Sequence, residues 1–220
     1  MFGPLDPQTL IVRALVVLVM LGIAFPIHEF AHALAAYRLG DGTAKLMGRL
    51  TLDPRAHFDP MGGLLLAATV MLTTFGFGWA KPTPYNPRNL QGGRWGEAIV
   101  SAAGPISNLV LAIAGALPLR YINATGMDAG LVGSFLSFFV TINLVLMVFN
   151  LIPIPPLDGS KVLFAFLNPR TVWQIRPVLE QYGFLILIAA MFLPIVGGQT
   201  IIGVVFNVLL FPLERLLVGG

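Results

Sequence analysis

The sequence predicts an all-α polytopic membrane protein, and two observations carry this prediction. The chain of 220 residues is 56% hydrophobic and only 10% charged, with a mean hydropathy of +0.84. Soluble domains have about 25% charged residues, so a soluble globule of this composition would lack polar groups to cover its surface. The second observation is a series of apolar stretches of about 20 residues, the length that spans a bilayer. We expect one membrane-embedded domain over residues 1–220, surrounded by the lipid bilayer.

We expect about five to six transmembrane helices. The first apolar stretch joins a run at 10–25 to the following residues 26–38 as one long helix. Pro26 should kink it, because proline cannot donate a hydrogen bond to the carbonyl of Gly22. The five stretches that look able to cross are 10–38, 97–119, 131–153, 178–196 and 199–217.

A sixth apolar run, 61–78, is bracketed by polar segments rich in proline and glycine. Lys and Arg are frequent before it, at 38–55, and after it, at 81–94. If the run crossed the membrane, both sides would carry a basic cluster, against the tendency of basic loops to stay inside. If it enters and returns, every Lys and Arg except Arg13 and Arg120 lies inside. The charges therefore favour a re-entrant segment, covered by protein or by a water-filled cavity, and a cytosolic C-terminus.

Charge and cysteine content exclude other functions. The net charge of +3 comes from scattered Lys and Arg, without a basic cluster or alternation of aromatic and basic residues. Nucleic acid is therefore not an expected partner. The sequence contains no Cys, which excludes disulfides and thiolate metal ligands.

The first apolar stretch contains a metal-binding pattern. His28, Glu29 and His32 form the motif H-E-x-x-H. Residues four apart on a helix share a face, so both imidazoles can reach one ion, and Glu29 can accept a proton from water bound to that ion. The alternative is a hydrogen-bonded packing cluster. Ionisable side chains inside an apolar segment are costly and usually functional, which favours the metal site.

A catalytic zinc site usually has three protein ligands, so a third ligand is needed. Asp158 is one candidate, because the prolines between 153 and 156 break the preceding helix and leave this carboxylate at membrane depth. Its alternative role is the N-cap of the following helix. His57 is the second candidate, and an interfacial polar loop is its alternative. The re-entrant topology would bring Asp158 out at the depth of His32.

Polar residues in two further helices have two interpretations each. Asn108 follows small residues, so it either lies in a close helix contact or lines a polar site with its amide. Asn150 either caps its helix or donates an amide N–H to the developing oxyanion.

Residues 79–89 are rich in proline and are expected to be extended. The motif H-E-x-x-H is typical of metalloproteases. If this chain hydrolyses a helical substrate, that substrate must first unwind, because a helix hides its carbonyls in hydrogen bonds, and an extended edge could pair with the unwound peptide. Trp79, Lys81 and Pro82 are therefore candidate substrate-binding residues. The alternative is an ordinary cytosolic loop.

The motifs together resemble the site-2 protease family of intramembrane zinc metalloproteases. The resemblance covers nearly the whole chain and rests on H-E-x-x-H at 28–32, AGPISN at 103–108 and the run ending in Asp-Gly at 150–159. Segments 57–62 and 78–82 are similar to the compact prokaryotic branch, which lacks PDZ and CBS domains.

The resemblance implies one zinc ion per chain, bound by His28, His32 and Asp158. Glu29 would be the general base, and Asn150 would help hold the scissile carbonyl. A short membrane-embedded β element would follow the motif helix. The protein would lie in the cytoplasmic (inner) membrane, with its active site nearer the cytosolic face, and its substrates would be membrane proteins cut within a transmembrane segment.

The expected reaction is hydrolysis by water that zinc activates and Glu29 deprotonates. Two other classes remain open: a metal or ion transporter that uses the same three ligands transiently, and an inactive scaffold that binds membrane helices. Glu29 discriminates between them, because a transporter would tolerate Gln at this position and a protease would not. Nickel, cobalt or iron would also suit two histidines and one carboxylate.

Overall fold

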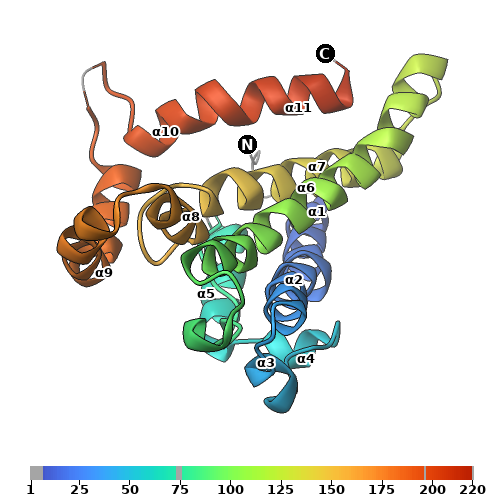
Figure 1. Ribbon diagram of the computed structural model, residues 1–220. Coiled ribbons are helices and arrows are strands. Elements are labelled where there is room, and N and C mark those ends of the chain that lie inside the picture. The colour runs from blue at the N-terminus through green and yellow to red at the C-terminus, as the bar shows by residue number, and fades with distance from the viewer. Residues whose placement is uncertain (1–6, 73–75, 196, 220) are drawn as a thin grey trace.

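Helices dominate the computed structural model, which describes residues 7–72, 76–195 and 197–219 (Figure 1). Five helical runs in these ranges are long and apolar enough to cross a membrane, as expected of a multi-pass membrane protein. In length and composition they match the stretches predicted from the sequence, to within a few residues at most ends. The runs are Thr9–Arg38, Arg94–Thr125, Gly130–Asn150, Pro169–Phe192 and Ile201–Val218.

The first run is continuous but changes its pitch. The helix α1 (Pro7–Val19) passes through a π-helical turn (Met20–Ala24) into α2 (Phe25–Arg38). Pro26 lies in the first turn of α2 and has no N–H to donate to the carbonyl four residues earlier, at Gly22. The π turn contains Gly22. The irregularity expected at Pro26 therefore takes the form of a π turn, and α2 carries the H-E-x-x-H motif.

The helices α6 (Arg94–Thr125) and α7 (Gly130–Asn150) form an antiparallel pair at the centre of the protein (Figure 1). Their shared core contains Ala112 and Ala116 of α6 and Val140 and Leu144 of α7. In a bilayer, small residues stabilise such a pair because they let the backbones approach and make van der Waals contact.

The chain between α2 and α6 leaves the C-terminal end of α2 and later returns to it. It runs through α3 (Thr43–Leu46) and α4 (Pro54–His57) into α5 (Pro60–Leu72), and then returns without regular secondary structure over 76–86. The Leu39 carbonyl accepts a hydrogen bond from the Gln91 amide at 2.8 Å. The Asp41 carboxylate accepts one from the Asn86 amide at 2.8 Å. The excursion therefore begins and ends at the C-terminal end of α2.

The returning segment packs directly on α5 through glycine. A Cβ on Gly62 would lie 2.2 Å from the Trp79 carbonyl oxygen, and a Cβ on Gly78 would lie 2.4 Å from the Leu66 Cβ. Glycine is required at both positions because no other residue leaves room for the facing backbone.

The expected β element after the motif helix is not confirmed. The described residues contain no strand, and their one isolated β-bridge joins Pro194 and Thr200, far along the chain. Prolines at 82 and 84 lack an N–H, and neighbouring N–H groups are bound elsewhere. Lys81 donates to the His57 carbonyl, Thr83 to the Glu29 carboxylate and Asn86 to the Asp41 carboxylate.

The last helical run of the chain lies beside α6. The helices α8 (Asp158–Phe166) and α9 (Pro169–Phe192) lead to a last run of α10 (Ile201–Val205), a π turn (Phe206–Leu210) and α11 (Phe211–Val218). At its start, Ile202 packs with Ile152, just beyond α7. At its end, the Leu216 carbonyl accepts a hydrogen bond from Arg120 Nη1 at 3.1 Å. The last run is therefore parallel to α6.

This arrangement corrects the position expected for the C-terminal end. The charge pattern placed Arg120 outside and the C-terminus in the cytosol, whereas the structure places Arg120 against the end of α11. The C-terminal ends of α6 and α11 lie on the same side.

This topology can be tested with single cysteines, since the chain has none of its own. Cysteines at Leu46, which is 89% exposed, and at Arg88 should react with an impermeant maleimide from one side of the membrane. Cysteines at Met127 and Gly219 should react from the opposite side. Labelling in right-side-out and inside-out vesicles measures this. Reaction of the Gly219 and Leu46 variants from the same side would contradict the arrangement.

Candidate metal centre

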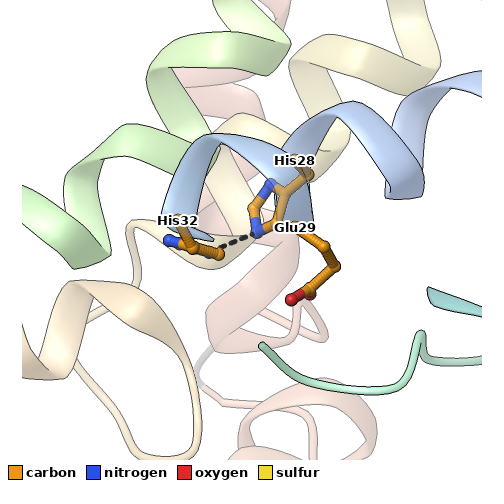
Figure 2. Close-up of side chains that lie close together, drawn as sticks. All are labelled: His28, Glu29 and His32. Atoms are coloured by element: carbon orange, nitrogen blue, oxygen red, sulfur yellow. Dashed lines mark hydrogen bonds between the residues drawn. The ribbon is translucent and has the colours of Figure 1, made fainter. Parts of the chain in front are cut away.

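His28 and His32 lie one turn apart on a buried face of α2 (Figure 2). Their Nε2 atoms are 3.0 Å apart, and each side chain belongs to a residue only 7% exposed. Glu29 joins them, with one ligand atom from each of the three residues within 4.8 Å of the others. The spacing of the motif therefore brings its three polar side chains together, as the sequence predicted.

The contacts on the far side of each ring determine where its proton lies. His28 Nδ1 is 2.6 Å from Asn108 Oδ1, and His32 Nδ1 is 2.7 Å from the Val100 carbonyl oxygen. Both oxygens can only accept, so each Nδ1 must carry the proton. Both Nε2 atoms then present a lone pair.

A chain of amides holds Asn108 in the orientation this requires. Asn108 Nδ2 donates to Asn143 Oδ1 at 3.1 Å, and Asn143 Nδ2 donates to the Phe139 carbonyl at 2.8 Å. Both asparagines are fully buried between α6 and α7. Asn108 therefore both fills a helix contact and serves the polar site, so the two interpretations of the sequence are compatible.

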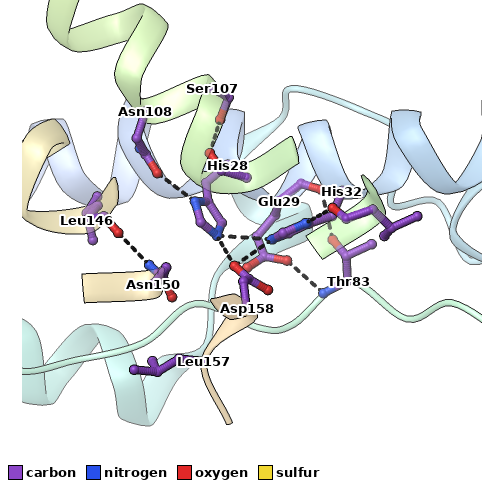
Figure 3. Close-up of polar contacts among 12 residues, drawn as sticks. His28, Glu29, His32, Thr83, Ser107, Asn108, Leu146, Asn150, Leu157 and Asp158 are labelled. Carbon is purple, nitrogen blue, oxygen red and sulfur yellow. Dashed lines mark hydrogen bonds and ion pairs between the residues drawn. The ribbon is translucent and has the colours of Figure 1, made fainter. Parts of the chain in front are cut away.

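Asp158 brings a third lone-pair atom to the histidines (Figure 3). It is the first residue of α8, and its Oδ2 lies 3.3 Å from the Nε2 atoms of both His28 and His32. The N-cap position belongs to Leu157, so Asp158 does not cap the helix. Asp158 therefore lies beside both histidines.

The spacing of these three atoms fits zinc. Tetrahedral ligands at about 2.0–2.1 Å from zinc lie about 3.3 Å from one another. The observed separations are 3.0, 3.3 and 3.3 Å. Three lone pairs this close repel one another unless a cation lies between them. Two neutral imidazoles and one carboxylate are also a usual donor set for zinc.

Two glycines make room for this arrangement. A Cβ on Gly104 would lie 2.5 Å from His32 Nε2 and 2.6 Å from His28 Nε2. A Cβ on Gly159 would lie 2.1 Å from the Leu151 carbonyl oxygen, so glycine lets α8 begin where Asp158 faces the histidines. The sequence analysis used Gly104 only as part of a motif, and a glycine inside an apolar helix was the available signal.

Glu29 faces the returning segment (Figure 3). Its Oε2 accepts a hydrogen bond from the Thr83 amide at 2.7 Å, and the Thr83 hydroxyl donates to the Glu29 main-chain carbonyl at 3.0 Å. The sequence analysis missed Thr83, because its carboxylate contact comes from a backbone N–H that every residue except proline carries. The position between two prolines was the available signal.

Two predicted site residues have other partners. Asn150 Nδ2 donates to the Leu146 carbonyl at 2.9 Å, one turn back on α7 (Figure 3). His57 is 1% exposed, and its Nε2 donates to the Thr51 carbonyl at 2.8 Å. In the described part of the chain, the metal-binding group contains His28, Glu29 and His32 but not His57.

Trp79, Lys81 and Pro82 all lie on the returning segment. Trp79 is 41% exposed and stacks edge-on against Phe77, with ring centroids 6.1 Å apart. Lys81 is held by its amide, which donates to the His57 carbonyl at 2.8 Å. Pro82 directly precedes Thr83, so this segment reaches the metal centre through Thr83.

Buried donors arranged for a metal ion inside apolar helices define a membrane metalloprotein. Comparisons with known proteins name the family. Peptidase family M50 matches residues 116–193, a range that includes Asp158. "Putative zinc metalloprotease YwhC" of Bacillus subtilis is 40% identical over 179 residues, covering 79% of this chain and 78% of the relative.

Two mycobacterial relatives are similar over much of the chain. "Putative zinc metalloprotease Rip2" of Mycolicibacterium smegmatis is 36% identical, over 76% of this chain and 63% of the relative. The protein of the same name from Mycobacterium tuberculosis H37Rv is 34% identical, over 87% of this chain and 73% of the relative. No solved structure matches the chain. The chain therefore belongs to peptidase family M50, the site-2 protease family, and is a zinc metalloprotease.

Gly104→Ala should lower zinc affinity by more than roughly tenfold, because its methyl group would displace both Nε2 atoms. Gly115→Ala is a matched control on the same helix, since its Cβ would meet Phe139 at 2.7 Å, away from the zinc-binding atoms. Zinc titration and thermal unfolding of both variants measure this. Equal zinc affinity in the two variants would show that Gly104 serves packing alone.

Asn108→Leu should weaken zinc binding roughly 10- to 100-fold, because it removes the acceptor that holds the proton on His28 Nδ1. Asn108→Asp keeps an acceptor oxygen and should bind zinc more tightly than Asn108→Leu. Competition with a chelator of known affinity measures both. If the two variants hold zinc equally, the amide does not orient His28.

Proposed function

We propose that this protein hydrolyses peptide bonds within transmembrane segments of membrane proteins. In this proposal, His28, His32 and Asp158 hold the zinc ion and Glu29 is the general base. The observation that supports it is the convergence of two Nε2 atoms and one carboxylate oxygen, with a second carboxylate beside them. That constellation lies inside helices apolar enough to cross a membrane.

Zinc, when bound, supplies Lewis acidity that polarises the scissile carbonyl and lowers the pKa of water. Glu29 accepts the proton of the attacking water and transfers it to the leaving amine. Its Oε2 is held by Thr83, and within the described residues its Oε1 has no hydrogen-bond partner. In this proposal, Oε1 is therefore the oxygen that accepts the proton of the attacking water.

Asn150 is the proposed donor to the developing oxyanion. It is the last residue of α7, where the chain turns toward Asp158, and its amide N–H bonds the Leu146 carbonyl. Rotation of the side chain would exchange this carbonyl for the substrate oxygen. An oxyanion donor is typically worth about 2.7–4 kcal/mol in the transition state.

We also propose that α5 is re-entrant. It has 13 residues, too few to cross a bilayer. Arg13, which is 3% exposed, donates to the carbonyls of Val70 at 3.2 Å and Met71 at 2.8 Å, at the end of α5. A helix that ends at membrane depth needs partners for its last carbonyls, and Arg13 supplies them.

The basic residues at 38–55 and 81–94 flank the end of α2 where the excursion closes. We therefore propose that the metal centre opens toward the cytosolic face of the cytoplasmic membrane. Substrate would lie along 79–82, including Trp79, Lys81 and Pro82. Because the Lys81 and Thr83 amides are bound within the protein, an unwound substrate would donate its own N–H groups to carbonyls there.

Glu29→Gln should abolish cleavage of single-span model substrates in liposomes, by more than roughly 100-fold, because the amide cannot accept the proton of water. Bound zinc should stay at the wild-type level. Glu180→Gln is the matched control, since this carboxylate is 53% exposed and pairs with Arg176. Cleavage by the Glu29→Gln variant at the wild-type rate would contradict the assignment. Zinc flux through vesicles containing either protein would instead indicate a transporter.

A further inference from the structure

Residues 81–86, here called the strap, form the end of the returning segment and contact three other parts of the protein. Lys81 donates its amide to the His57 carbonyl at 2.8 Å, at the end of α4. Tyr85 faces α8, with the Lys161 ammonium 5.1 Å from its ring centroid. Asn86 binds Asp41 beyond the end of α2. The strap therefore runs from the end of α4 past Glu29 to α8, the helix that carries Asp158.

One residue of the strap contacts Glu29 twice. The Thr83 amide reaches the carboxylate at 2.7 Å, and the Thr83 hydroxyl reaches the main-chain carbonyl of the same glutamate at 3.0 Å. Thr83 is 9% exposed, so water competes poorly for these bonds. A hydrogen bond to an ionised carboxylate is among the stronger kinds in proteins.

The neighbours of Thr83 make this contact rigid. Pro82 and Pro84 have fixed φ angles and carry no N–H, so Thr83 supplies the single amide donor of residues 82–84. The residue before a proline is also restricted to extended conformations. The amide of Thr83 therefore has little freedom to turn away from Glu29.

The far end of the strap is fixed by a buried carboxylate. Asp41 is fully buried and accepts hydrogen bonds from the Asn86 amide at 2.8 Å, Asn89 Nδ2 at 2.9 Å and the Thr43 hydroxyl at 2.7 Å. Burial alone would raise the pKa of Asp41, but these hydrogen bonds outweigh it and hold the pKa below its ordinary value. Asp41 is therefore an ionised anchor at neutral pH.

We propose that Thr83 is a positioning residue for catalysis: its amide fixes one carboxylate oxygen of Glu29, so that the other oxygen faces the zinc-bound substrate site, and Asp41 holds the strap in the register that this requires. The inference rests on the proposed function, because it assigns Thr83 a role only if Glu29 is the general base. Displacing a catalytic group by about 1 Å can cost about 100-fold in rate.

The test compares three substitutions in the full-length zinc protein, using a single-span substrate in liposomes. Thr83→Pro removes both donors and keeps extended backbone, Thr83→Val removes the hydroxyl alone, and Thr83→Ser keeps both. We expect Thr83→Pro to lower kcat roughly 10- to 100-fold, with KM and zinc content unchanged. Thr83→Val should lower kcat less than Thr83→Pro does, and Thr83→Ser should keep most of the wild-type kcat.

A second background separates positioning from general stability. The carboxylate of Glu29→Asp is one methylene shorter and does not reach the Thr83 amide. Thr83→Pro should therefore change kcat by less than about threefold in this background, because interacting residues are non-additive. Asp41→Asn, which weakens the anchor away from the zinc, should likewise lower kcat in the wild-type background and change it by less than about threefold in the Glu29→Asp background. If Thr83→Pro does not fold, the comparison of Asp41→Asn in the two backgrounds tests the proposal in its place.

Equal kcat in Thr83→Pro and Thr83→Val would overturn the proposal, as would equal losses in the wild-type and Glu29→Asp backgrounds. A loss of zinc with kcat per bound zinc unchanged would also overturn it, since the strap would then serve the fold alone. If Glu29→Gln remains active, the proposed function fails instead. If Glu29→Gln is inactive and Thr83→Pro equals Thr83→Val, only the positioning role fails.

Discussion

The metal centre depends on where two protons lie. An imidazole binds a metal with its unprotonated nitrogen, so each histidine needs an acceptor on its other side. Asn108 and the Val100 carbonyl are those acceptors, and both come from α6. Because the proton of each ring is fixed away from Asp158, the space between the three side chains is left with lone pairs only. Burial among apolar helices makes this arrangement unfavourable without a cation, so the same contacts that shape the site also create its affinity for one.

A single face of α6 organises the centre. Val100, Gly104 and Asn108 are spaced four residues apart, so they lie in one row along the helix. The first binds His32, the second leaves space for both rings, and the third binds His28. Asn108 is in turn held by Asn143 of α7. The central helix pair therefore carries the groups that orient the histidines, while α2 and α8 carry the proposed metal ligands.

The parts of this protein that the sequence predicted are those with a side-chain signature. Apolar length predicted the spans, and H-E-x-x-H predicted the pair of histidines on one helix face. Asp158 was predicted because a carboxylate after a broken apolar helix is costly without a function. Val100 and Thr83 could not be predicted in the same way, because both contact the site through the backbone. Val100 does so through its carbonyl, which every residue type carries, and Thr83 through its N–H, which every residue except proline carries. The contact between Arg120 and α11 could not be predicted either, because its acceptor is a backbone carbonyl that any residue carries.

The contact between Arg13 and the end of α5 has a consequence for how the protein is made. Arg13 lies in the first apolar run, and the carbonyls that it binds are 57 and 58 residues further along the chain. During synthesis, the first helix enters the membrane before those carbonyls exist. An arginine at the centre of a helix opposes insertion by about 2.5–3.5 kcal/mol, and the cost is smaller for Arg13, which lies near the N-terminal end of its run. The high hydropathy of this run, 2.6, offsets that cost, so the helix can wait in the bilayer until α5 arrives. The order of synthesis then makes the docking of α5 a late step that removes a charge from lipid.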